Sequence, residues 1–389
     1  MQPSLSRAAL LFAAAAFLSV LFGTEGWTHD SALALARVGS YLGFYFFIVS
    51  WVDSRQRMRK VGLTLLAATI LVALFAICQE IAGGYTSLWL YLKPAGQLYG
   101  DSWDNRATSF FGFPNSLANY MNFMIPFALA CHLLAETARW KKLSAWSLGL
   151  GTVALACSQS RGGLVALGFV LMLAIFYFGN NWRIRFPLLF GLGLLALLSY
   201  FVGTILNLEH LGEIEKTGAG RLLLWDTAWK LFTQSPIFGV GWGNFEQIYG
   251  YYIHVSWIPP GVLWVHNLYL QLLSETGLVG FGAFFFVVFI ALREARRQMR
   301  LPSHFHRALS FGVFGAILTM LVHGFVDTII GAQIAAIYWM WLALLAASGR
   351  LCSTKIADAQ YVGIASLKIQ TVVDRRKSPG GCADLCDFV

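Results

Sequence analysis

The sequence predicts an all-α polytopic membrane protein with about ten transmembrane helices and a large external segment that carries amphipathic helices. Hydrophobic residues make up 57% of the 389 residues and charged residues only 12%, whereas soluble domains usually contain about 25% charged residues. Apolar runs long enough to cross a bilayer recur from end to end, since a transmembrane helix needs about 20 residues. We therefore expect one integral membrane domain over residues 1–349, followed by a polar tail over residues 350–389.

Ten apolar runs define the expected spans. The first begins just after Arg7, but a second run follows closely and no small-residue cleavage site stands out, so we interpret it as a membrane helix and not a secretory signal. The tail lacks helical periodicity and is predicted to be disordered. The approximate limits of the runs are 8–23, 31–52, 61–81, 114–135, 143–158, 162–179, 186–206, 276–293, 307–329 and 332–349.

The basic residues predict the orientation of these spans. Most of the 28 Lys and Arg residues fall in the tail and in every second connection, starting from the amino terminus. Because short cytoplasmic loops carry an excess of Lys and Arg, both termini are predicted to be cytoplasmic. The net charge of +9 therefore reflects membrane topology, and it gives no indication of nucleic-acid binding, which would require a continuous basic stripe.

Three arginines run against this charge bias because they lie on the predicted external face. Arg106 stands in "RATSFFGFPNS", Arg161 in "SQSRGG" and Arg221 in "GRLLLWDTAW". The planar guanidinium fork matches the oxygens of phosphate or pyrophosphate and stays charged at any working pH. An anionic ligand at the outer surface is one interpretation; the alternative is that each arginine reaches for lipid headgroups.

The largest external segment is predicted to span residues 207–275. Within it Leu222, Trp225 and Trp229 recur at helical spacing, which indicates an amphipathic helix lying on the membrane surface. Trp225 is a candidate for stacking on a sugar, although Trp and Tyr also gather at membrane interfaces for purely interfacial reasons.

The stretch "HNLYLQLLSETGLVG" carries the strongest candidate for proton transfer. His266 can exchange a proton near neutral pH, as a general base on a sugar hydroxyl must; the alternative is a structural, hydrogen-bonded histidine. Asn267 is predicted either to hold a substrate oxygen or to cap the following helix. Gly277 and Gly280 are predicted to let a neighbouring helix pack closely.

These motifs together resemble a known family. The histidine stretch matches the pattern H-[NSQ]-x9-G-x-x-[GTY] of bacterial O-antigen ligases. The stretches "RATSFFGFPNSLANY", "SQSRGGLVAL", "GRLLLWDTAWKLFTQSPIFGVGWGNF" and "HNLYLQLLSETGLVG" follow one another in the order found in these ligases and their polymerase relatives. The resemblance covers roughly residues 100–345 and implies a GT-C-like membrane glycosyltransferase.

The resemblance implies a concrete reaction. Such ligases transfer a glycan from undecaprenyl diphosphate to the lipid A core oligosaccharide at the periplasmic face of the bacterial inner membrane. Arg161 and Arg221 match the arginines expected to bind the donor diphosphate, and His266 matches the proposed base. Arg106, Asn267, Trp225 and Asp327 are the predicted substrate-binding residues, of which Arg106 and Asp327 are weaker matches. We expect an inverting transfer without metal or other cofactor, in which the two arginines neutralise the leaving diphosphate.

Several alternatives stay open at this stage. An O-antigen or exopolysaccharide polymerase, or a protein O-oligosaccharyltransferase, would use the same lipid-linked donor. A transporter is a third class, to which Arg37 within the second span is the best pointer, although the chain shows no convincing internal repeat. A metal-dependent reaction would rely on paired external carboxylates. These are Asp101 with Asp104, or Glu213 with Glu215.

Overall fold

The computed structural model is built of helices, and the residues that it describes include no strand. These residues are 3–81, 106–179, 181–182, 184–187, 189–191, 211–252, 264–328 and 333–352. The predicted all-α class is therefore confirmed for this part of the chain. The predicted tail lies outside the described residues, apart from its first three positions.

Seven of the described helices are long and apolar enough to cross a membrane. They are Ser4–Phe22 within α1 (Pro3–Phe22), α2 (His29–Trp51), α3 (Arg55–Ile81), α7 (Arg161–Phe178), α11 (Leu268–Gln298), α12 (His304–His323) and the last helix, Gln333–Cys352. Two more of the ten expected spans are present as helices of 20 residues, α5 (Pro114–Leu133) and α6 (Ala138–Cys157). The expected span at 186–206 falls almost wholly outside the described residues, so the number ten is not confirmed.

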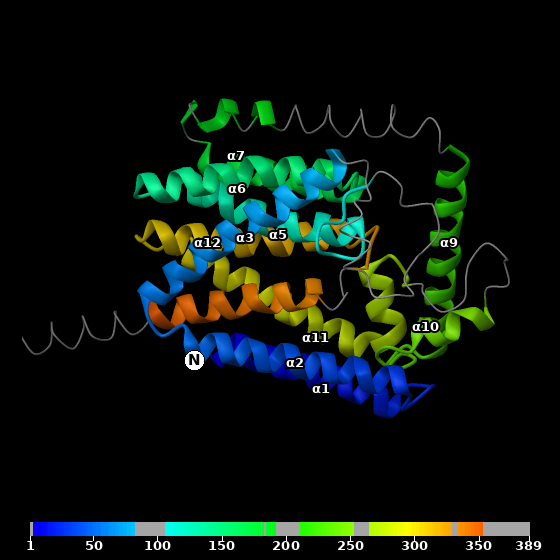
Figure 1. Cartoon of the computed structure of the whole chain (residues 1–389). Coiled ribbons are helices and arrows are strands. Elements are labelled where there is room, and N and C mark those ends of the chain that lie inside the picture. Colours follow the sequence, from blue (N-terminus) through cyan, green and yellow to red (C-terminus); the bar gives the residue numbers. More distant parts are fainter. Residues whose placement is uncertain are drawn as a thin grey trace, which may run out of the picture.

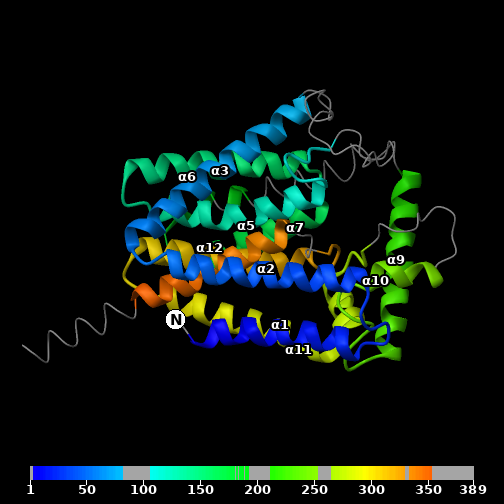
Figure 2. The ribbon, with the colours of Figure 1, turned by 60° about the horizontal axis from the view of Figure 1, so that its bottom comes forward.

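The long helices run side by side in one bundle, with α5 at its centre (Figures 1 and 2). Nearly every side chain of α5 from Leu117 onward is buried. In α12 and in the last helix, 72% of the most apolar 18-residue stretch is buried. A helix that is apolar on all sides can be buried on all sides. These three helices therefore form the core around which the others pack.

Small residues set the closest helix contact in this core. A Cβ atom added at Gly312 would lie 2.6 Å from Cβ of Phe127, and one added at Gly315 would lie 2.5 Å from Cβ of Pro126. The two glycines are three residues apart on α12, so together they make a shallow face on which α5 rests, as small residues do in membrane helix pairs.

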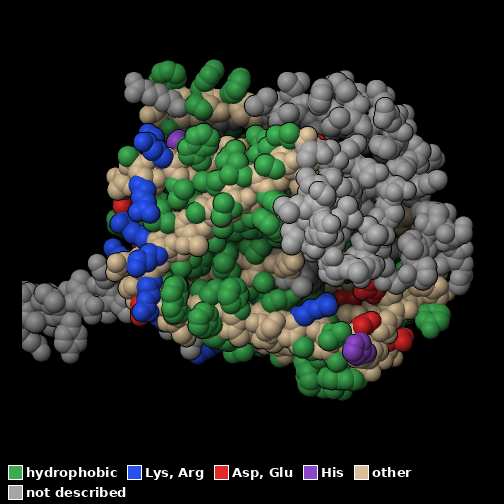
Figure 3. All heavy atoms as spheres, in the orientation of Figure 1, with side chains coloured by type: hydrophobic (Ala, Val, Ile, Leu, Met, Phe, Trp, Pro, Cys, Tyr) green, Lys and Arg blue, Asp and Glu red, His purple; other side chains and the backbone are tan. Residues whose placement is uncertain are grey.

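The outer helices turn large apolar side chains away from the core. Phe47 on α2, Leu71 on α3 and Phe176 on α7 are 60%, 65% and 90% exposed. Figure 3 shows such side chains spread over the side of the bundle. In water this surface would be a large aggregation-prone patch, but hydrocarbon solvates it at no cost.

The two ends of the bundle differ in charge. Lys and Arg residues fall at the start of α3, at the start of α6 and around the connection from α11 to α12. In Figure 3 they form a row along the end of the bundle where the amino terminus lies. The starts of α5, α7 and α11 and the end of α12 all lie at the other end, and the candidate residues lie there.

Helix α9 (Leu211–Gln234) lies across this second end, at a steep angle to the bundle helices in both ribbon views (Figures 1 and 2). Leu224, Ala228 and Leu231 on one face are buried against a small apolar cluster with Val240, Phe245 and Val265, whereas Leu222 and Trp229 are exposed. A helix is thus present where the amphipathic one was predicted, but Leu224, Ala228 and Leu231 form its buried face in place of the predicted Leu222 and Trp229, and this face covers the candidate site end of the bundle.

Helix α11 is broken at Gly277, whose backbone angles of φ 58° and ψ −163° are not helical. The segment 236–241 fills the break. Val240 and Gly241 donate backbone hydrogen bonds to the carbonyls of Ser274 and Glu275, and the backbone N–H groups of Leu278 and Val279 donate to the carbonyls of Pro236 and Ile237. A break inside a membrane helix leaves such groups without partners, and here the entering loop supplies them.

The break corrects two predictions. The apolar run predicts a span from residue 276, whereas the helix begins at Leu268, directly after the predicted cap residue Asn267. Gly277 does not serve the close packing of another helix. A Cβ atom there would lie 2.3 Å from the carbonyl oxygen of Ile237, so this glycine admits the backbone of a loop.

Candidate functional site

His266 is held at the start of α11 by the residues on either side of it. The N–H of Val265 donates to Oε1 of Gln271. The N–H of Leu268 donates to the carbonyl of Gly324, just after α12. His266 itself has φ 52°, a left-handed conformation that is uncommon for a residue with a side chain. This sharp turn separates the histidine from the helix and leaves its side chain 26% exposed.

Asn267 serves as the cap of α11. Its side-chain carbonyl accepts hydrogen bonds from the N–H groups of Tyr269 and Leu270, both at 3.0 Å, and its amide donates to the carbonyl of Phe325. Of the two predicted roles for Asn267, the structure shows the cap. These bonds fix the turn that carries His266, which is the ordinary function of an N-cap asparagine.

His266 is paired with Asp327. Nδ1 of His266 lies 3.2 Å from Oδ1 of Asp327, whose side chain is 8% exposed. Burial alone would raise the pKa of the Asp327 carboxyl, but the hydrogen bond from His266 and the positive charges of His323, His266 and Arg221 hold this pKa below its ordinary value. An ionised carboxylate can only accept, so Nδ1 of His266 must carry the proton. In the neutral imidazole the basic nitrogen is therefore Nε2.

Arg161 begins α7, which packs against the same turn. Ser160 caps this helix by accepting a hydrogen bond from the N–H of Gly163. A Cβ atom at Gly162 would lie 2.7 Å from Cδ2 of His323 and 2.6 Å from Cγ2 of Val326. The motif "SRGG" therefore needs a glycine after the arginine, because only glycine lets the start of α7 reach the end of α12.

Electrostatic interaction links all three candidate arginines. Burial, together with the charges of Arg221 and Arg161, lowers the pKa of Arg106 to about 10, although the charge of Asp327 acts to raise it. Burial also lowers the pKa of Arg221, and the charge of Asp327 again raises it. Arg106, Arg161, Arg221, Asp327 and His266 thus form one cluster, although they are spread over more than 220 positions of the chain. All three guanidinium groups remain positive at neutral pH.

Two of these arginines have donors to spare. Arg106 donates from Nε to the carbonyl of Ser158 at 3.0 Å and also reaches Asn115. Within the described part of the chain, by contrast, the guanidinium groups of Arg161 and Arg221 form neither a hydrogen bond nor an ion pair. Positive groups held near one another without partners repel, and an anion bound between them would relieve the repulsion.

The backbone adds to this preference for an anion. The amino-terminal ends of α7 and α11 both lie in the cluster, beside Arg161 and His266. The amino terminus of a helix carries a partial positive charge and is a favourable place for phosphate. The site therefore combines a partly exposed histidine, a buried carboxylate hydrogen-bonded to it, and three arginines close to two helix amino termini.

Two further residues of the cluster had no role predicted from the sequence. Asn119 on α5 donates to Oδ2 of Asp327 at 3.5 Å, and His323 lies with Nε2 3.4 Å from Oγ of Ser160. Both are buried. His323 belongs to "HGFVD", the same stretch as Asp327, so a second polar residue near the end of an apolar run was the available signal.

Trp225 lies in α9, partly buried against the apolar cluster at this end of the bundle. Its Nε1 is buried and has no hydrogen-bond partner among the described residues. Its predicted role in substrate binding stays a prediction. The carboxylates considered for a metal also stay untested, since Asp101, Asp104 and the side chains of Glu213 and Glu215 lie outside the described residues.

Comparison with known protein families supports the resemblance seen in the motifs. Residues 146–285 match the family model of the O-antigen ligases. The matched region runs from α6 through the first part of α11 and includes Arg161, Arg221 and His266; Arg106 and Asp327 lie outside it. No curated protein matches the chain significantly. Members of the O-antigen ligase family are glycosyltransferase-like enzymes, and seven apolar helices in such a chain indicate a multi-pass membrane protein.

Proposed function

We propose that the protein transfers a glycan from undecaprenyl diphosphate to a sugar hydroxyl at the periplasmic face of the bacterial inner membrane, with lipid A core oligosaccharide as the acceptor. The observation that carries this proposal is the clustering of the His266–Asp327 pair with Arg106, Arg161 and Arg221. A base beside a cationic surface is what a hydroxyl nucleophile and a diphosphate leaving group require.

The proposed reaction is a single inverting displacement. Nε2 of His266 takes the proton of the acceptor hydroxyl as its oxygen attacks the anomeric carbon of the donor. The bond from that carbon to the diphosphate oxygen breaks, and undecaprenyl diphosphate leaves. Asp327 keeps the imidazole in the correct tautomer and stabilises the imidazolium that forms, without itself taking a proton.

The arginines act on the leaving group. Negative charge grows on the diphosphate as the glycosidic bond breaks. The guanidinium groups of Arg161 and Arg221, which have no partner among the described residues, therefore stabilise the transition state more than the ground state. Arg106 adds a positive charge whose position is fixed by the hydrogen bond from its Nε to the carbonyl of Ser158. These groups perform the neutralisation for which a metal ion would otherwise be needed, so we propose a metal-independent reaction.

The charge asymmetry of the bundle supports the proposed orientation. If the basic end faces the cytoplasm, the positive-inside rule is obeyed and both the amino terminus and the last helix end there. The candidate site at the opposite end then faces the periplasm, where α9 would lie along the membrane surface.

A polymerase that uses the same donor is the second candidate function, since the family match covers the donor-binding arginines and the histidine that both reactions need. Gene deletion separates the two. For a ligase we expect long glycan to accumulate on the lipid carrier while none reaches lipid A core. A glycan ladder that collapses to single repeats would instead identify a polymerase.

The direct test is transfer by purified protein in nanodiscs, supplied with lipid-linked glycan and lipid A core. We expect His266→Ala and Arg221→Ala to abolish transfer while protein level and membrane insertion persist. Near-normal turnover by either variant would show that the residue does not have the proposed role.

A further inference from the structure

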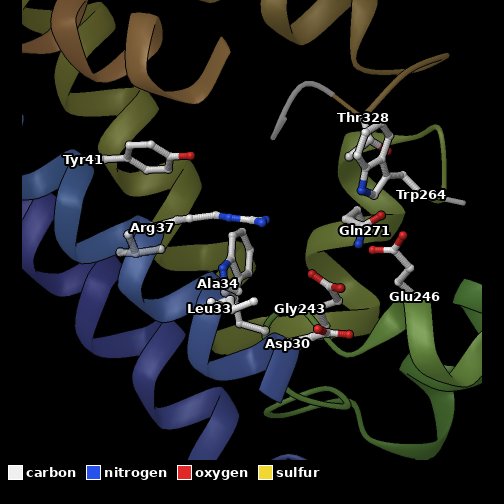
Figure 4. Close-up of a pocket in the computed structure, with 13 residues that line it drawn as sticks. Asp30, Leu33, Ala34, Arg37, Tyr41, Gly243, Glu246, Trp264, Gln271 and Thr328 are labelled. Carbon is white, nitrogen blue, oxygen red and sulfur yellow. The ribbon is translucent and has the colours of Figure 1, made fainter. Parts of the chain in front are cut away.

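A polar cavity lies beside the His266–Asp327 pair but is lined by different elements from those that carry the arginines. Its volume is about 140 Å³, and its lining comes from α2, the segment around α10 (Phe245–Ile248) and the first part of α11. It approaches the pair through Trp264, two residues before His266, and Thr328, the neighbour of Asp327 (Figure 4). The cavity therefore adjoins the proposed base without including the anion-binding surface.

Three polar side chains of this cavity have unused hydrogen-bonding capacity. The guanidinium of Arg37 and the carboxylate of Glu246 form no hydrogen bond or ion pair with any described residue. Oγ1 of Thr328 is buried, in a residue that is 8% exposed, and has no partner among the described residues. A buried hydroxyl without a partner is costly, and a polar ligand in the cavity would satisfy it.

Arg37 and Glu246 face the cavity from different sides. In Figure 4 the Arg37 side chain points from α2 toward the group formed by Trp264, Gln271, Thr328 and Glu246. Burial and the nearby Asp30 raise the pKa of Glu246, and the charge of Arg37 lowers it. The charges of Arg37 and Glu246 therefore influence each other. They are not close enough to form an ion pair, so the space between them offers donors on one side and acceptors on the other.

The charge of the cavity argues against a second phosphate site. Asp30 and Glu246 place two carboxylates around a single cation, Arg37, and the buried Glu275 adds a third carboxyl group. Glu275 is already satisfied, since it accepts a hydrogen bond from the N–H of Phe245 at 3.1 Å. An anion would be repelled here, whereas a neutral polyhydroxylated ring can donate to the carboxylates and accept from Arg37 and Thr328. Trp264 adds an aromatic side chain of the kind that packs on the apolar face of a sugar.

The size of the cavity sets the extent of the ligand. Complete small-molecule sites usually measure about 300–1,000 Å³, so 140 Å³ accommodates one sugar ring and excludes an oligosaccharide. The ring that enters must therefore be the end of a chain that continues outside.

We propose that this cavity binds the terminal sugar of the glycan acceptor and places its hydroxyl beside Nε2 of His266. The inference rests on the proposed transferase function. In an inverting displacement the attacking oxygen approaches from the side opposite to the leaving group, so acceptor and diphosphate need separate subsites. The arginine cluster and the cavity meet this need, because the cavity lining includes none of the three arginines of the cluster, and its Trp264 and Thr328 are close neighbours in the chain of His266 and Asp327.

The test separates acceptor from donor by their Michaelis constants. In Glu246→Gln and in Thr328→Val we expect the KM for lipid A core to rise about tenfold, the effect of losing one hydrogen bond to a charged or buried group. The KM for lipid-linked glycan should stay within about twofold of the wild-type value. Glu25→Gln is the matched control, since this exposed carboxylate lies at the same end of the molecule and outside the cavity; it should leave both constants unchanged.

Two outcomes would overturn the inference. An unchanged acceptor KM in both variants would show that the cavity does not bind the acceptor, and a raised donor KM with an unchanged acceptor KM would assign the cavity to the donor. Thermal unfolding of each variant guards against misfolding, and the nearly isosteric Thr328→Val provides a second variant if Glu246→Gln is unstable. Failure of the proposed function would look different, because the wild-type protein itself would then transfer no glycan.

Discussion

Oδ1 of Asp327 lies 3.2 Å from Nδ1 of His266, and the carboxylate is almost completely buried while the imidazole remains partly open. The two residues come from the turn after α12 and the turn before α11, which are joined by the backbone hydrogen bond from Leu268 to Gly324. This arrangement fixes Nδ1 of His266 as the nitrogen that carries the proton in the neutral imidazole and leaves Nε2 as the basic nitrogen.

Asp327→Asn should lower kcat by about 10²–10⁴-fold, because an amide can donate to Nδ1 and thereby stabilise the wrong tautomer of the imidazole. The KM for the lipid-linked donor should change little. The measurement is transfer at saturating donor and acceptor. Asp226→Asn is the control, since this exposed carboxylate pairs only with Lys230 on α9. A kcat above half the wild-type value in Asp327→Asn would contradict an orienting role.

Replacement of Arg161 or Arg221 should separate the contribution of charge from that of geometry. Lysine keeps the charge but loses the planar fork, so we expect a drop in kcat of about tenfold for each lysine variant and of about 10²–10³-fold for each alanine variant. Arg57→Lys, at the basic end and paired with Asp53, should behave as wild type. Equal activity of lysine variants and wild type would indicate that charge alone suffices and that bidentate binding of the diphosphate does not occur.

The ionisation of Asp327 predicts a pH dependence of stability. Its pKa is lower in the folded protein than the ordinary value of 3.8, so its stabilising contribution is fully present above about pH 4 and is lost as the pH falls through the folded-state pKa. The difference in Tm between wild type and Asp327→Asn should therefore be widest at neutral pH and shrink below pH 4. A difference that stays constant from pH 3 to pH 7 would show that folding does not lower the pKa of the Asp327 carboxyl.

Gly277→Ala should destabilise the protein by about 1–3 kcal/mol, because the added Cβ meets the Ile237 carbonyl and a side chain is strained at φ 58°. The control is Gly282→Ala, in the same helix, where an added Cβ has no atom within 4 Å. Thermal unfolding in detergent measures both. A Tm for Gly277→Ala equal to that of the control would mean that the loop 236–241 does not occupy the break.

Chelation should leave activity intact if the arginines alone neutralise the diphosphate. Purified protein treated with EDTA should transfer glycan at the untreated rate. Loss of activity that returns on addition of magnesium or manganese would contradict the mechanism in which the arginines neutralise the diphosphate without a metal. It would instead favour a metal site formed by the paired external carboxylates.

Composition and periodicity were enough to predict the helical membrane fold, because the need for about 20 apolar residues is imposed by the bilayer and not by tertiary structure. Asn267 was a candidate cap of the following helix, but the apolar run begins only near residue 276, because the preceding residues include polar Gln271, Ser274 and Glu275. All three are buried, and Ser274 and Glu275 accept hydrogen bonds from the segment around residues 240–245. Their environment comes from a distant part of the chain, which a local pattern does not reveal.

The site was predictable to a different degree for different residues. Arg161, Arg221 and His266 stood out by type and motif, and the structure brings them into one cluster, although their roles remain proposals. No role for Arg37 could be predicted from the sequence beyond its unusual place in a span, because the cavity residues that face it from outside α2 lie more than 200 residues away in the chain. The pairing of His266 with Asp327 likewise depends on the contact between α11 and α12, which spacing along the chain does not specify.

The loop seated in the break of α11 also has a consequence for biogenesis. Residues 236–241 are synthesised before the helix that receives them, and the carbonyls and amides of the break find their partners only when both segments have left the insertion machinery and met. A newly inserted chain can therefore have its membrane helices in place while the break in α11 is still unfilled. For the proposed transferase, this end of α11 would then be among the last parts of the site to be completed.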